Sequence, residues 1–368
     1  MQPAITAIGI ANPPYKRSQQ EIAALICDGF NLKGAQKRLV KAIYKASGIE
    51  QRYSVINDYC KSPGEFDFFP NEPDAPLPST AKRMQLYKEH ALKLALQAIN
   101  DCLSGLAFNK IEITHLITVS CTGMYAPGLD IELVQHLELQ STTKRTAINF
   151  MGCYGAFNGI KIADTICRAD PHANVLVVCV ELCTIHFQRA QSMENVISNA
   201  IFADGAAAVL IQGKKTNPIY LSLESFHCDL VPQTSQEMAW QIADYGFDIV
   251  LSSYVPQAIK SGITQFSEKL LQTVNWSFKD IDYFAIHPGG LKILQACEEA
   301  LSISYEDNKH SYEVLSKFGN MSSATILFVL KKIWNSLEKQ DHGKNIFSCA
   351  FGPGLTLESM LLKTGYLA

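Results

Sequence analysis

A surplus of basic residues is missing from this 368-residue sequence, in which 32 lysines and arginines are outnumbered by 35 aspartates and glutamates. Without a positive field the chain lacks the attraction to phosphate that nucleic-acid-binding proteins use, so we expect no nucleic-acid partner. No stretch approaches the roughly 18 uninterrupted apolar residues of a membrane span. The N-terminus also lacks the charged and apolar segments of a secretory signal, and we predict a cytoplasmic protein that does not enter the membrane.

Paired cysteines at metal-ligand spacing are missing too. The eleven cysteines are an odd number and contain no CxxC motif, so neither a zinc site nor a disulfide framework is expected. They fit a reducing compartment instead. A hydrophobic content of 47% with 18% charged residues can bury a large core in two domains or in one duplicated domain. This composition, with no excess of positive charge, favours an enzyme that acts on small molecules.

The segment 144–167, KRTAINFMGCYGAFNGIKIADTIC, predicts a buried strand that passes through a tight turn into a helix. Cys153 lies at that turn between Gly152 and Gly155, which allow close backbone approach. Unpaired N–H groups at a helix N-terminus favour a thiolate, so we predict a lowered pKa and a nucleophilic role for Cys153. The alternative is a structural cysteine packed between two glycines. A base and a hydrogen-bond donor at matching positions would favour the nucleophile.

The chain repeats a pattern of helix, turn and strand. The strand end at Cys121 aligns with the strand end at His287, and the turn at Cys153 aligns with the turn at Asn320, at nearly constant offsets. The sequence therefore predicts an α/β protein of two duplicated halves that meet at a pseudo-twofold axis, 1–215 and 216–368. Such a duplication brings Cys153, His287 and Asn320 to one central pocket.

Five ordered motifs carry a resemblance to a known family: GCYGAFNG around Cys153, AIFADGAAAVLI around Phe202, AIHPGG around His287, SKFGNMSSATILFVL around Asn320, and the C-terminal AFGPGLTLE. Together they resemble the type III polyketide synthases, the chalcone and stilbene synthase family within the thiolase fold. The resemblance extends over 5–362. It implies a homodimer with a thiolase-like, five-layered αβαβα fold and central mixed sheets, which agrees with the duplication.

The resemblance implies a decarboxylating condensing enzyme that joins an acyl-CoA starter to malonyl-CoA units. Cys153 would hold the starter as a thioester, because a thiolate exchanges acyl groups with a coenzyme A thioester at little free-energy cost. His287 and Asn320 would donate hydrogen bonds to the malonyl carbonyl as carbon dioxide leaves, and His287 would also pair with Cys153. Coenzyme A thioesters are the substrates, and no other cofactor and no metal is implied.

The resemblance also implies a substrate pocket with Phe202 as its gatekeeper. The further substrate-binding positions that it implies are Cys121, Thr122, His186, Trp240, Ile249, Ser322, Gly352 and Pro353. Trp240 would fill space and Ile249 would remove an aromatic wall, which favours an aliphatic starter and a pyrone or resorcinol/phloroglucinol-type product. For His186 the alternative is a hydrogen-bonded core histidine. Ala126 aligns with the methionine that crosses the dimer interface in plant members, so a shared pocket wall is not expected.

Basic residues concentrate on a helix predicted over 33–45, well before a long amphipathic helix predicted over 80–103. The resemblance implies that coenzyme A binds near the first of these helices. Its phosphates would contact Lys41, Lys45 and Arg52, because compact cationic groups hold a phosphate as point charges. The alternative for this helix is a solvated surface.

Three other functions compete with this interpretation. A chain-initiating β-ketoacyl-ACP synthase of the same fold also uses cysteine, histidine and asparagine, but it needs a docking surface for an acidic carrier protein. A papain-like cysteine hydrolase has the same three residue types in the same chain order, yet its disulfides and its N-terminal cysteine position are missing here. A non-catalytic relative is disfavoured because all three reactive groups are present.

Overall fold

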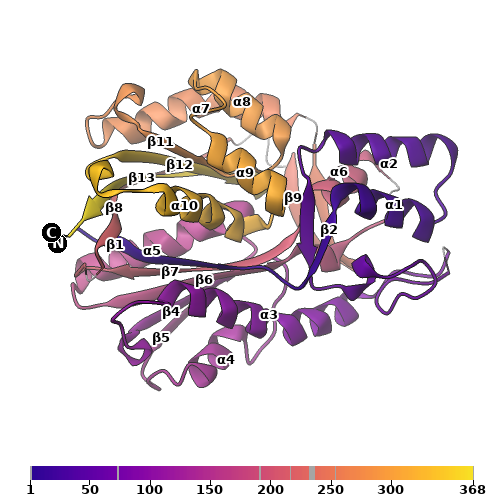
Figure 1. Ribbon diagram of the computed structural model, residues 1–368, viewed down its shortest axis with the longest axis horizontal. Helices are drawn as coiled ribbons and strands as arrows, with labels where there is room; N and C mark the ends of the chain where they lie inside the picture. Colours follow the sequence, from indigo (N-terminus) through magenta and orange to yellow (C-terminus); the bar gives the residue numbers. More distant parts are fainter. Residues whose placement is uncertain are drawn as a thin grey trace.

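The computed structural model describes residues 2–72, 74–189, 192–215, 217–231, 237–252 and 254–367. Within this part of the chain, one mixed sheet of nine strands dominates the molecule, in the order β11-β12-β13-β8-β1-β7-β6-β4-β5 (Figure 1). Its strands are β1 (Ala4–Ala11), β4 (His115–Ser120), β5 (Lys144–Asn149), β6 (Asn174–Leu182), β7 (Asp204–Gln212), β8 (Ile219–Leu230), β11 (Tyr283–Ile286), β12 (Asn345–Gly352) and β13 (Thr356–Tyr366).

The strand order repeats from one half of the sheet to the other. β4 is parallel to β6, β6 is antiparallel to β7, and β7 is antiparallel to β1. In the same way β11 is parallel to β12, β12 is antiparallel to β13, and β13 is antiparallel to β8. β1 and β8 then pair with each other and join the two half-sheets. This order confirms the duplication, whereas the boundary placed after residue 215 stays a prediction, because residue 216 lies outside the described residues.

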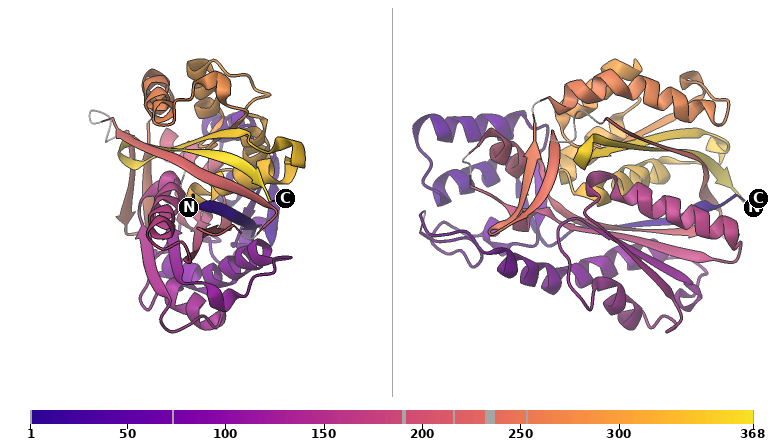
Figure 2. Two further views of the ribbon diagram at one scale, coloured as in Figure 1. Left: turned by 90° about the vertical axis from the view of Figure 1, so that its left-hand side faces the viewer. Right: turned by 180° about the vertical axis from the view of Figure 1, so that it is seen from behind.

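Helices form three layers around the two half-sheets (Figures 1 and 2). α3 and α4 cover one outer face, α7 and α8 cover the other, and α5 and α10 pack between the half-sheets. Their bounds are α3 (Thr80–Leu103), α4 (Leu129–His136), α5 (Gly155–Ala169), α7 (Val255–Gln272), α8 (Leu291–Leu301) and α10 (Thr325–Ser336). The five-layered αβαβα fold is therefore confirmed, and α3 has the predicted bounds.

Small residues let α3 lie directly on the sheet. A Cβ atom on Gly9 of β1 would lie 2.1 Å from the backbone nitrogen of Cys102 in α3, so only glycine fits there. Ala91, Ala95 and Ala98 continue the buried face of α3 at helical spacing. The helix therefore holds β1 at the centre of the sheet, next to the junction of the two halves.

A smaller group of elements covers one end of the sheet. It contains the helices α1 (Gln19–Gly29), α2 (Gly34–Ala46), α6 (Met193–Ile201) and α9 (Lys309–Phe318), and the strand pairs β2 (Tyr15–Ser18) with β3 (Gln51–Ser54) and β9 (Met238–Ala243) with β10 (Gly246–Leu251). Within this group, the β9–β10 hairpin is the part that lies next to the layers (Figure 1). The two chain ends lie together at the far end of the molecule (Figure 2). Among the described residues, none of the helices has the length and apolar character required to span a bilayer.

Candidate active site

Cys153 lies where the N-terminal half turns from β5 into α5. A short 3-10 turn, Gly152–Tyr154, connects the two elements, and α5 begins at Gly155. Gly152 has a φ of +74°, and a Cβ atom there would lie 2.1 Å from Cδ of Pro353. Only glycine combines this backbone conformation with so close a neighbour. The predicted strand, turn and helix are present and place the thiol at the junction of the halves, but the prediction that the strand is buried is wrong, because β5 lies at the edge of the sheet with five of its six residues exposed.

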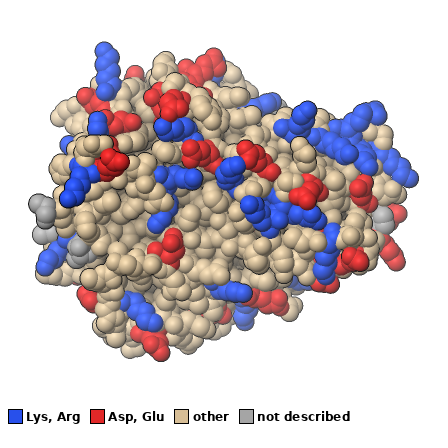
Figure 3. Space-filling model, in the orientation of Figure 1, with Lys and Arg blue, Asp and Glu red and all other residues tan. Residues whose placement is uncertain are grey.

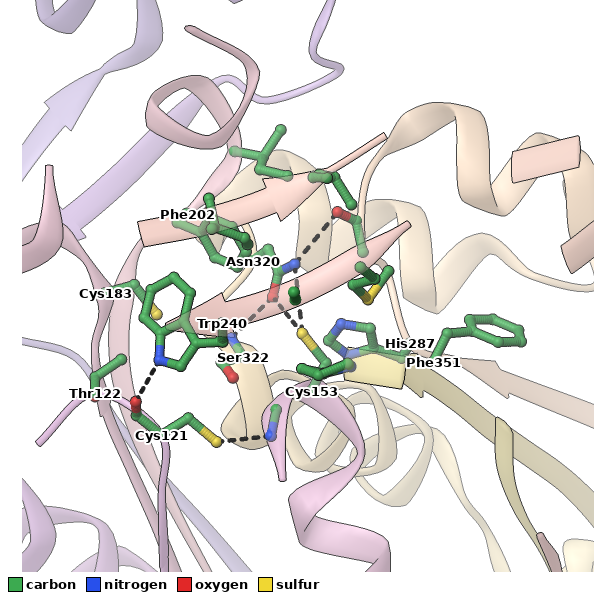
Figure 4. A pocket seen from close by; sticks show the side chains of 18 of the residues that line it. Cys121, Thr122, Cys153, Cys183, Phe202, Trp240, His287, Asn320, Ser322 and Phe351 are labelled. Atoms are coloured by element: carbon green, nitrogen blue, oxygen red, sulfur yellow. Dashed lines mark hydrogen bonds between the residues drawn. The ribbon is translucent and has the colours of Figure 1, made fainter. Parts of the chain in front are cut away.

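Asn320 occupies the equivalent turn of the C-terminal half, just before α10. Its side-chain Oδ1 accepts a hydrogen bond from the Ser322 backbone N–H at 2.8 Å, and its Nδ2 donates to the Gly289 carbonyl at 3.2 Å. These two bonds fix the plane of the carboxamide. The sulfur of Cys153 lies 3.9 Å from both Oδ1 and Nδ2 (Figure 4). The thiol and the carboxamide, 167 positions apart in sequence, are therefore in contact.

His287 follows the last residue of β11 and is only 1% exposed. Figure 4 shows its ring beside the sulfur of Cys153, in the same cavity as Asn320. Neither ring nitrogen has a hydrogen-bond partner among the described residues, so the predicted pairing of His287 with Cys153 is not made in this structure. Burial lowers the pKa of His287 to about 3, which keeps the imidazole neutral at physiological pH. Both nitrogens are therefore available to a substrate.

The structure contradicts the predicted acidity of Cys153. Burial raises the pKa of its thiol to about 12; the Ser322 side chain opposes this shift, and the charge of Glu181 adds to it. Loss of solvation outweighs the partial positive charge of the α5 N-terminus, which begins only at Gly155. The resting thiol is therefore protonated.

A cavity of about 50 Å³ connects these three groups. Of the predicted positions, it is lined by Phe202, Cys121, Thr122, Trp240, Ile249, Ser322 and Pro353, as Figure 4 shows in part. The lining residues that were not predicted from the sequence are Gly152, Cys183, Ile201, Met238, Ala239, Leu251, Gly289 and Ile293, whereas Phe351, which also lines the cavity, belongs to the C-terminal motif of the resemblance. Met238 and Leu251 had a signal, because Met238 lies two residues before Trp240 and Leu251 two residues after Ile249, on the same face of their strands.

Two predicted pocket positions lie outside this cavity. His186 is buried, with Nε2 bonded to the Thr122 carbonyl at 2.7 Å and Nδ1 accepting from the Phe247 backbone N–H at 3.0 Å. Its ring stacks on Phe247, so the alternative of a hydrogen-bonded core histidine is the one observed. Gly352 ends β12, where a Cβ atom would lie 2.6 Å from the Tyr154 ring. It allows close packing under the turn that carries Cys153.

The candidate residues for coenzyme A divide between the surface and the interior. Lys41 and Lys45 line an open groove between α1 and α2. Lysines and arginines gather over α2, at the upper right of Figure 3. Arg52, in contrast, is 3% exposed, and it donates hydrogen bonds to Gln19 and to the Phe202 carbonyl. Its guanidinium is buried and does not line the groove of Lys41 and Lys45, so the structure gives no support to the prediction that Arg52 holds a phosphate of coenzyme A.

This arrangement of side chains defines a class of enzyme. A thiol, a neutral imidazole and a fixed carboxamide meet where two duplicated α/β halves join, in a cavity with few charged groups. Such a set can carry an acyl group on sulfur and stabilise an oxyanion beside it. The fold and the site are those of a thiolase-fold condensing enzyme.

Comparisons with known proteins identify the family. The domain descriptions "Chalcone and stilbene synthases, N-terminal domain" and "C-terminal domain" match residues 2–215 and 222–365. A Mycobacterium tuberculosis protein named "Alpha-pyrone synthesis polyketide synthase-like Pks18" is 32% identical over 97% of this chain and 90% of its own length. The chain therefore belongs to the chalcone and stilbene synthase family. It is a type III polyketide synthase, an acyltransferase that condenses its substrates with decarboxylation.

Solved structures of the same family have the same fold. The crystal structure of PKS-I from the brown alga Ectocarpus siliculosus superposes with a TM-score of 0.90 at 30% identity, covering 98% of both chains. The C-terminal type III polyketide synthase domain of Steely1 from Dictyostelium superposes with a TM-score of 0.88 at 29% identity, covering 99% of both chains.

Proposed function

We propose that Cys153 carries the starter acyl group and that His287 and Asn320 act on both the thiol and the malonyl thioester. The observation that supports this most is the contact of the Cys153 sulfur with Asn320, beside an imidazole whose two nitrogens have no partner among the described residues. A buried polar group without a partner costs free energy. A substrate oxygen supplies the missing partner.

The reaction begins with acyl transfer. His287 takes the proton of the Cys153 thiol, and the thiolate attacks the starter thioester and releases coenzyme A. The carboxamide N–H of Asn320 donates a hydrogen bond to the oxyanion that forms. Because the cavity is apolar and mostly closed to water, each such hydrogen bond stabilises charge more strongly than it would in solution.

Decarboxylation and condensation follow in the same cavity. The malonyl carboxylate leaves as carbon dioxide, and the electron pair of the broken bond becomes an enolate whose oxygen accepts hydrogen bonds from His287 and Asn320. The enolate carbon attacks the acyl carbonyl on Cys153, a carbon–carbon bond forms, and the sulfur leaves as thiolate. Coenzyme A thioesters supply everything that these steps consume, so we propose no further cofactor.

The starter that we propose is an aliphatic acyl-CoA, and the product is of pyrone or resorcinol/phloroglucinol type. Trp240 narrows the cavity from the β9 side, its indole N–H donating to the Cys121 carbonyl at 2.7 Å, and Ile249 supplies an aliphatic wall. The relative Pks18 is named for α-pyrone synthesis, which agrees with this proposal.

A panel of acyl-CoA esters with labelled malonyl-CoA tests the proposed function. We expect release of labelled carbon dioxide and products whose masses equal one starter plus two or more acetate units. The same assay separates the two enzyme classes of this fold. Products made without carrier protein exclude a strictly carrier-dependent β-ketoacyl-ACP synthase, and a requirement for acyl carrier protein would contradict our proposal.

For the coenzyme A moiety we propose the groove between α1 and α2, where Lys41 and Lys45 contact the phosphates. No ion pair to either lysine is present among the described residues, so both charges are available to a ligand. A phosphate at this surface gains from several cationic neighbours on α2 at once. The groove therefore binds the nucleotide end while the acyl end reaches Cys153.

We also propose that the enzyme is a homodimer of the cytoplasm. β5 forms one edge of the sheet, and five of its six residues are exposed although the strand is paired with β4 on one side. An exposed edge strand exposes unpaired backbone groups to any second copy. A twofold-related β5 would cover this edge. All eleven cysteines are free in the structure, which supports a reducing compartment.

A further inference from the structure

A second cavity lies beside the catalytic cavity. Its volume is about 30 Å³. That is room for roughly two water molecules or for a small polar end group. Cys183, Phe202, Trp240 and Ile249 line both cavities, so the wall between them is a single layer of side chains. The second cavity therefore adjoins the catalytic cavity across this wall.

Arg52 gives this cavity an unsatisfied buried cation. A guanidinium has five N–H donors. In Arg52, Nε donates to Gln19 Oε1 at 2.9 Å and Nη1 donates to the Phe202 carbonyl. Nη2 has no hydrogen-bond partner among the described residues. Leaving charged donors buried without an acceptor is costly, so the position favours an oxygen ligand.

Two hydroxyl groups line the same cavity. Ser198 on α6 is 6% exposed, and no partner of its Oγ occurs in the described part of the chain. Tyr59 is also buried there, and burial raises its pKa to about 12, so the phenol stays protonated and can donate. Of the other polar groups of the wall, Thr184 is bonded to Asp204 and His186 to Thr122, and the side chains of Gln188, Asn195 and Asn199 also line the cavity. Arg52 and Ser198 therefore each bring to this wall a buried donor that has no acceptor among the described residues.

We propose that the second cavity binds an oxygen acceptor at the far end of the starter acyl chain while the chain is held on Cys153. A carboxylate fits best, because Arg52 is permanently charged and its Nη2 can donate twice. The chain crosses the wall beside Cys183, which has the smallest of the four shared side chains. This assignment rests on the proposed function and adds a specificity site to it.

The test compares starters that differ only in their end group. Succinyl-, glutaryl- and adipoyl-CoA each have a branched-alkyl CoA ester of the same shape, in which a CH(CH₃)₂ group replaces the carboxylate. At the chain length that spans the wall, we expect kcat/KM for the carboxylate to exceed that of its partner by about tenfold or more, the worth of a hydrogen bond to a charged group. Equal values at every length would overturn the proposal.

Variants then show which groups cause the preference. Ser198→Ala and Tyr59→Phe each remove one donor at nearly constant volume, and each should reduce the preference for the carboxylate several-fold while changing kcat/KM for the alkyl partner less than about twofold. Ser267→Ala is the matched control, because Ser267 on α7 is also a buried serine with no hydroxyl partner among the described residues, yet it lines neither cavity. A parallel fall for both end groups would mean a structural effect and would contradict the proposal.

Failure of this inference is distinguishable from failure of the proposed function. If the proposed function were wrong, no starter would yield a condensation product from malonyl-CoA. If only the inference were wrong, the alkyl starters would still be extended, without any preference for an oxygen-bearing end. If one of the two variants does not fold, the other measures the same quantity.

Discussion

The two halves place functional groups on equivalent turns, but the turns differ in chemistry. In the N-terminal half, the turn before α5 carries the thiol of Cys153, and in the C-terminal half the turn before α10 carries the carboxamide of Asn320. The C-terminal half adds the imidazole of His287 at the end of β11. The duplication therefore supplies position, and in the proposed mechanism residue identity at each position divides the reaction into acyl capture by one half and oxyanion stabilisation by the other.

Removing the thiol of Cys153 tests this division between the two halves most strongly. Cys153→Ala should reduce condensation by about 10⁴-fold or more, because it removes the thiol to which the starter is proposed to attach. Release of carbon dioxide from malonyl-CoA should persist, because His287 and Asn320 are unchanged. Labelled malonyl-CoA measures both quantities in one assay. Loss of decarboxylation together with condensation would show that the two halves do not act separately.

Removing the carboxamide should affect the other half-reaction. Asn320→Ala removes one donor to the enolate oxygen and should slow decarboxylation by about 10²- to 10³-fold. The rate at which Cys153 is acylated should fall less, because the oxyanion formed in acyl transfer keeps other donors. Intact-protein mass spectrometry of the acyl-enzyme measures this rate. Asn158→Ala is the matched control, because Asn158 on α5 also has a buried Nδ2 without a partner among the described residues and does not line the cavity. An unchanged decarboxylation rate in Asn320→Ala would contradict the role.

The two outer edges of the sheet also differ between the halves, in how exposed their strands are. β5 is almost fully exposed, whereas β11 at the opposite edge is mostly buried. Ala147→Glu, at an exposed position of β5, places a charge near its twofold mate and should weaken dimerisation by about tenfold or more, which sedimentation velocity measures. Ile242→Glu, at an exposed apolar position on β9, is the control and should leave the association constant unchanged. A monomeric parent enzyme would end this proposal.

The smallest expected effect is the pH dependence of stability. Burial raises the pKa of Glu181 in the N-terminal half from 4.5 to about 7, and burial lowers the pKa of His287 in the C-terminal half from 6.5 to about 3. A carboxyl with a raised folded pKa contributes stability below its unfolded pKa and loses it as pH rises, here between pH 4.5 and 7. A histidine with a lowered folded pKa contributes stability above its unfolded pKa and loses it as pH falls, here between 6.5 and 3.

Glu181→Gln tests the first of these slopes. Relative to the parent, its Tm should rise by a few degrees between about pH 4.5 and pH 7, because the amide does not ionise. Thermal unfolding across this range measures the difference. The surface variant Glu72→Gln should keep a constant difference from the parent. A constant difference for Glu181→Gln as well would show that its carboxyl is not perturbed by burial.

Much of the fold could be predicted because its signals are local or repeated. The long helix α3 had clear amphipathic spacing, and its bounds agree with the prediction. The repeated turns around Cys153 and Asn320 indicated the duplication and, through it, the contact between residues far apart in sequence. Most pocket positions carried over by family resemblance also line the cavity. These features follow from residue spacing and repeated motifs, which are visible in the sequence of a single chain.

Other features depended on burial, which no local pattern shows. Arg52 reads as a surface cation beside a basic helix, yet it lies inside the protein between Gln19 and the Phe202 carbonyl. His186 reads as a pocket residue, yet backbone groups of Thr122 and Phe247 bond both of its nitrogens. Trp240 and Phe247 of the β9–β10 hairpin pack against the His186 ring and help to bury it.

The sequence by itself determined the two-fold repetition, the order of the elements and the identity of the three groups that meet at the junction of the halves. Only the tertiary structure decided the protonation of those groups, because the pKa of Cys153 and His287 follows from how completely each is removed from water. It also decided that a second cavity, into whose wall Arg52 and Ser198 bring donors without a partner among the described residues, lies beside the first. A group loses its solvation only when the folded chain surrounds it, so the resulting pKa shift depends on all of the residues packed around that group.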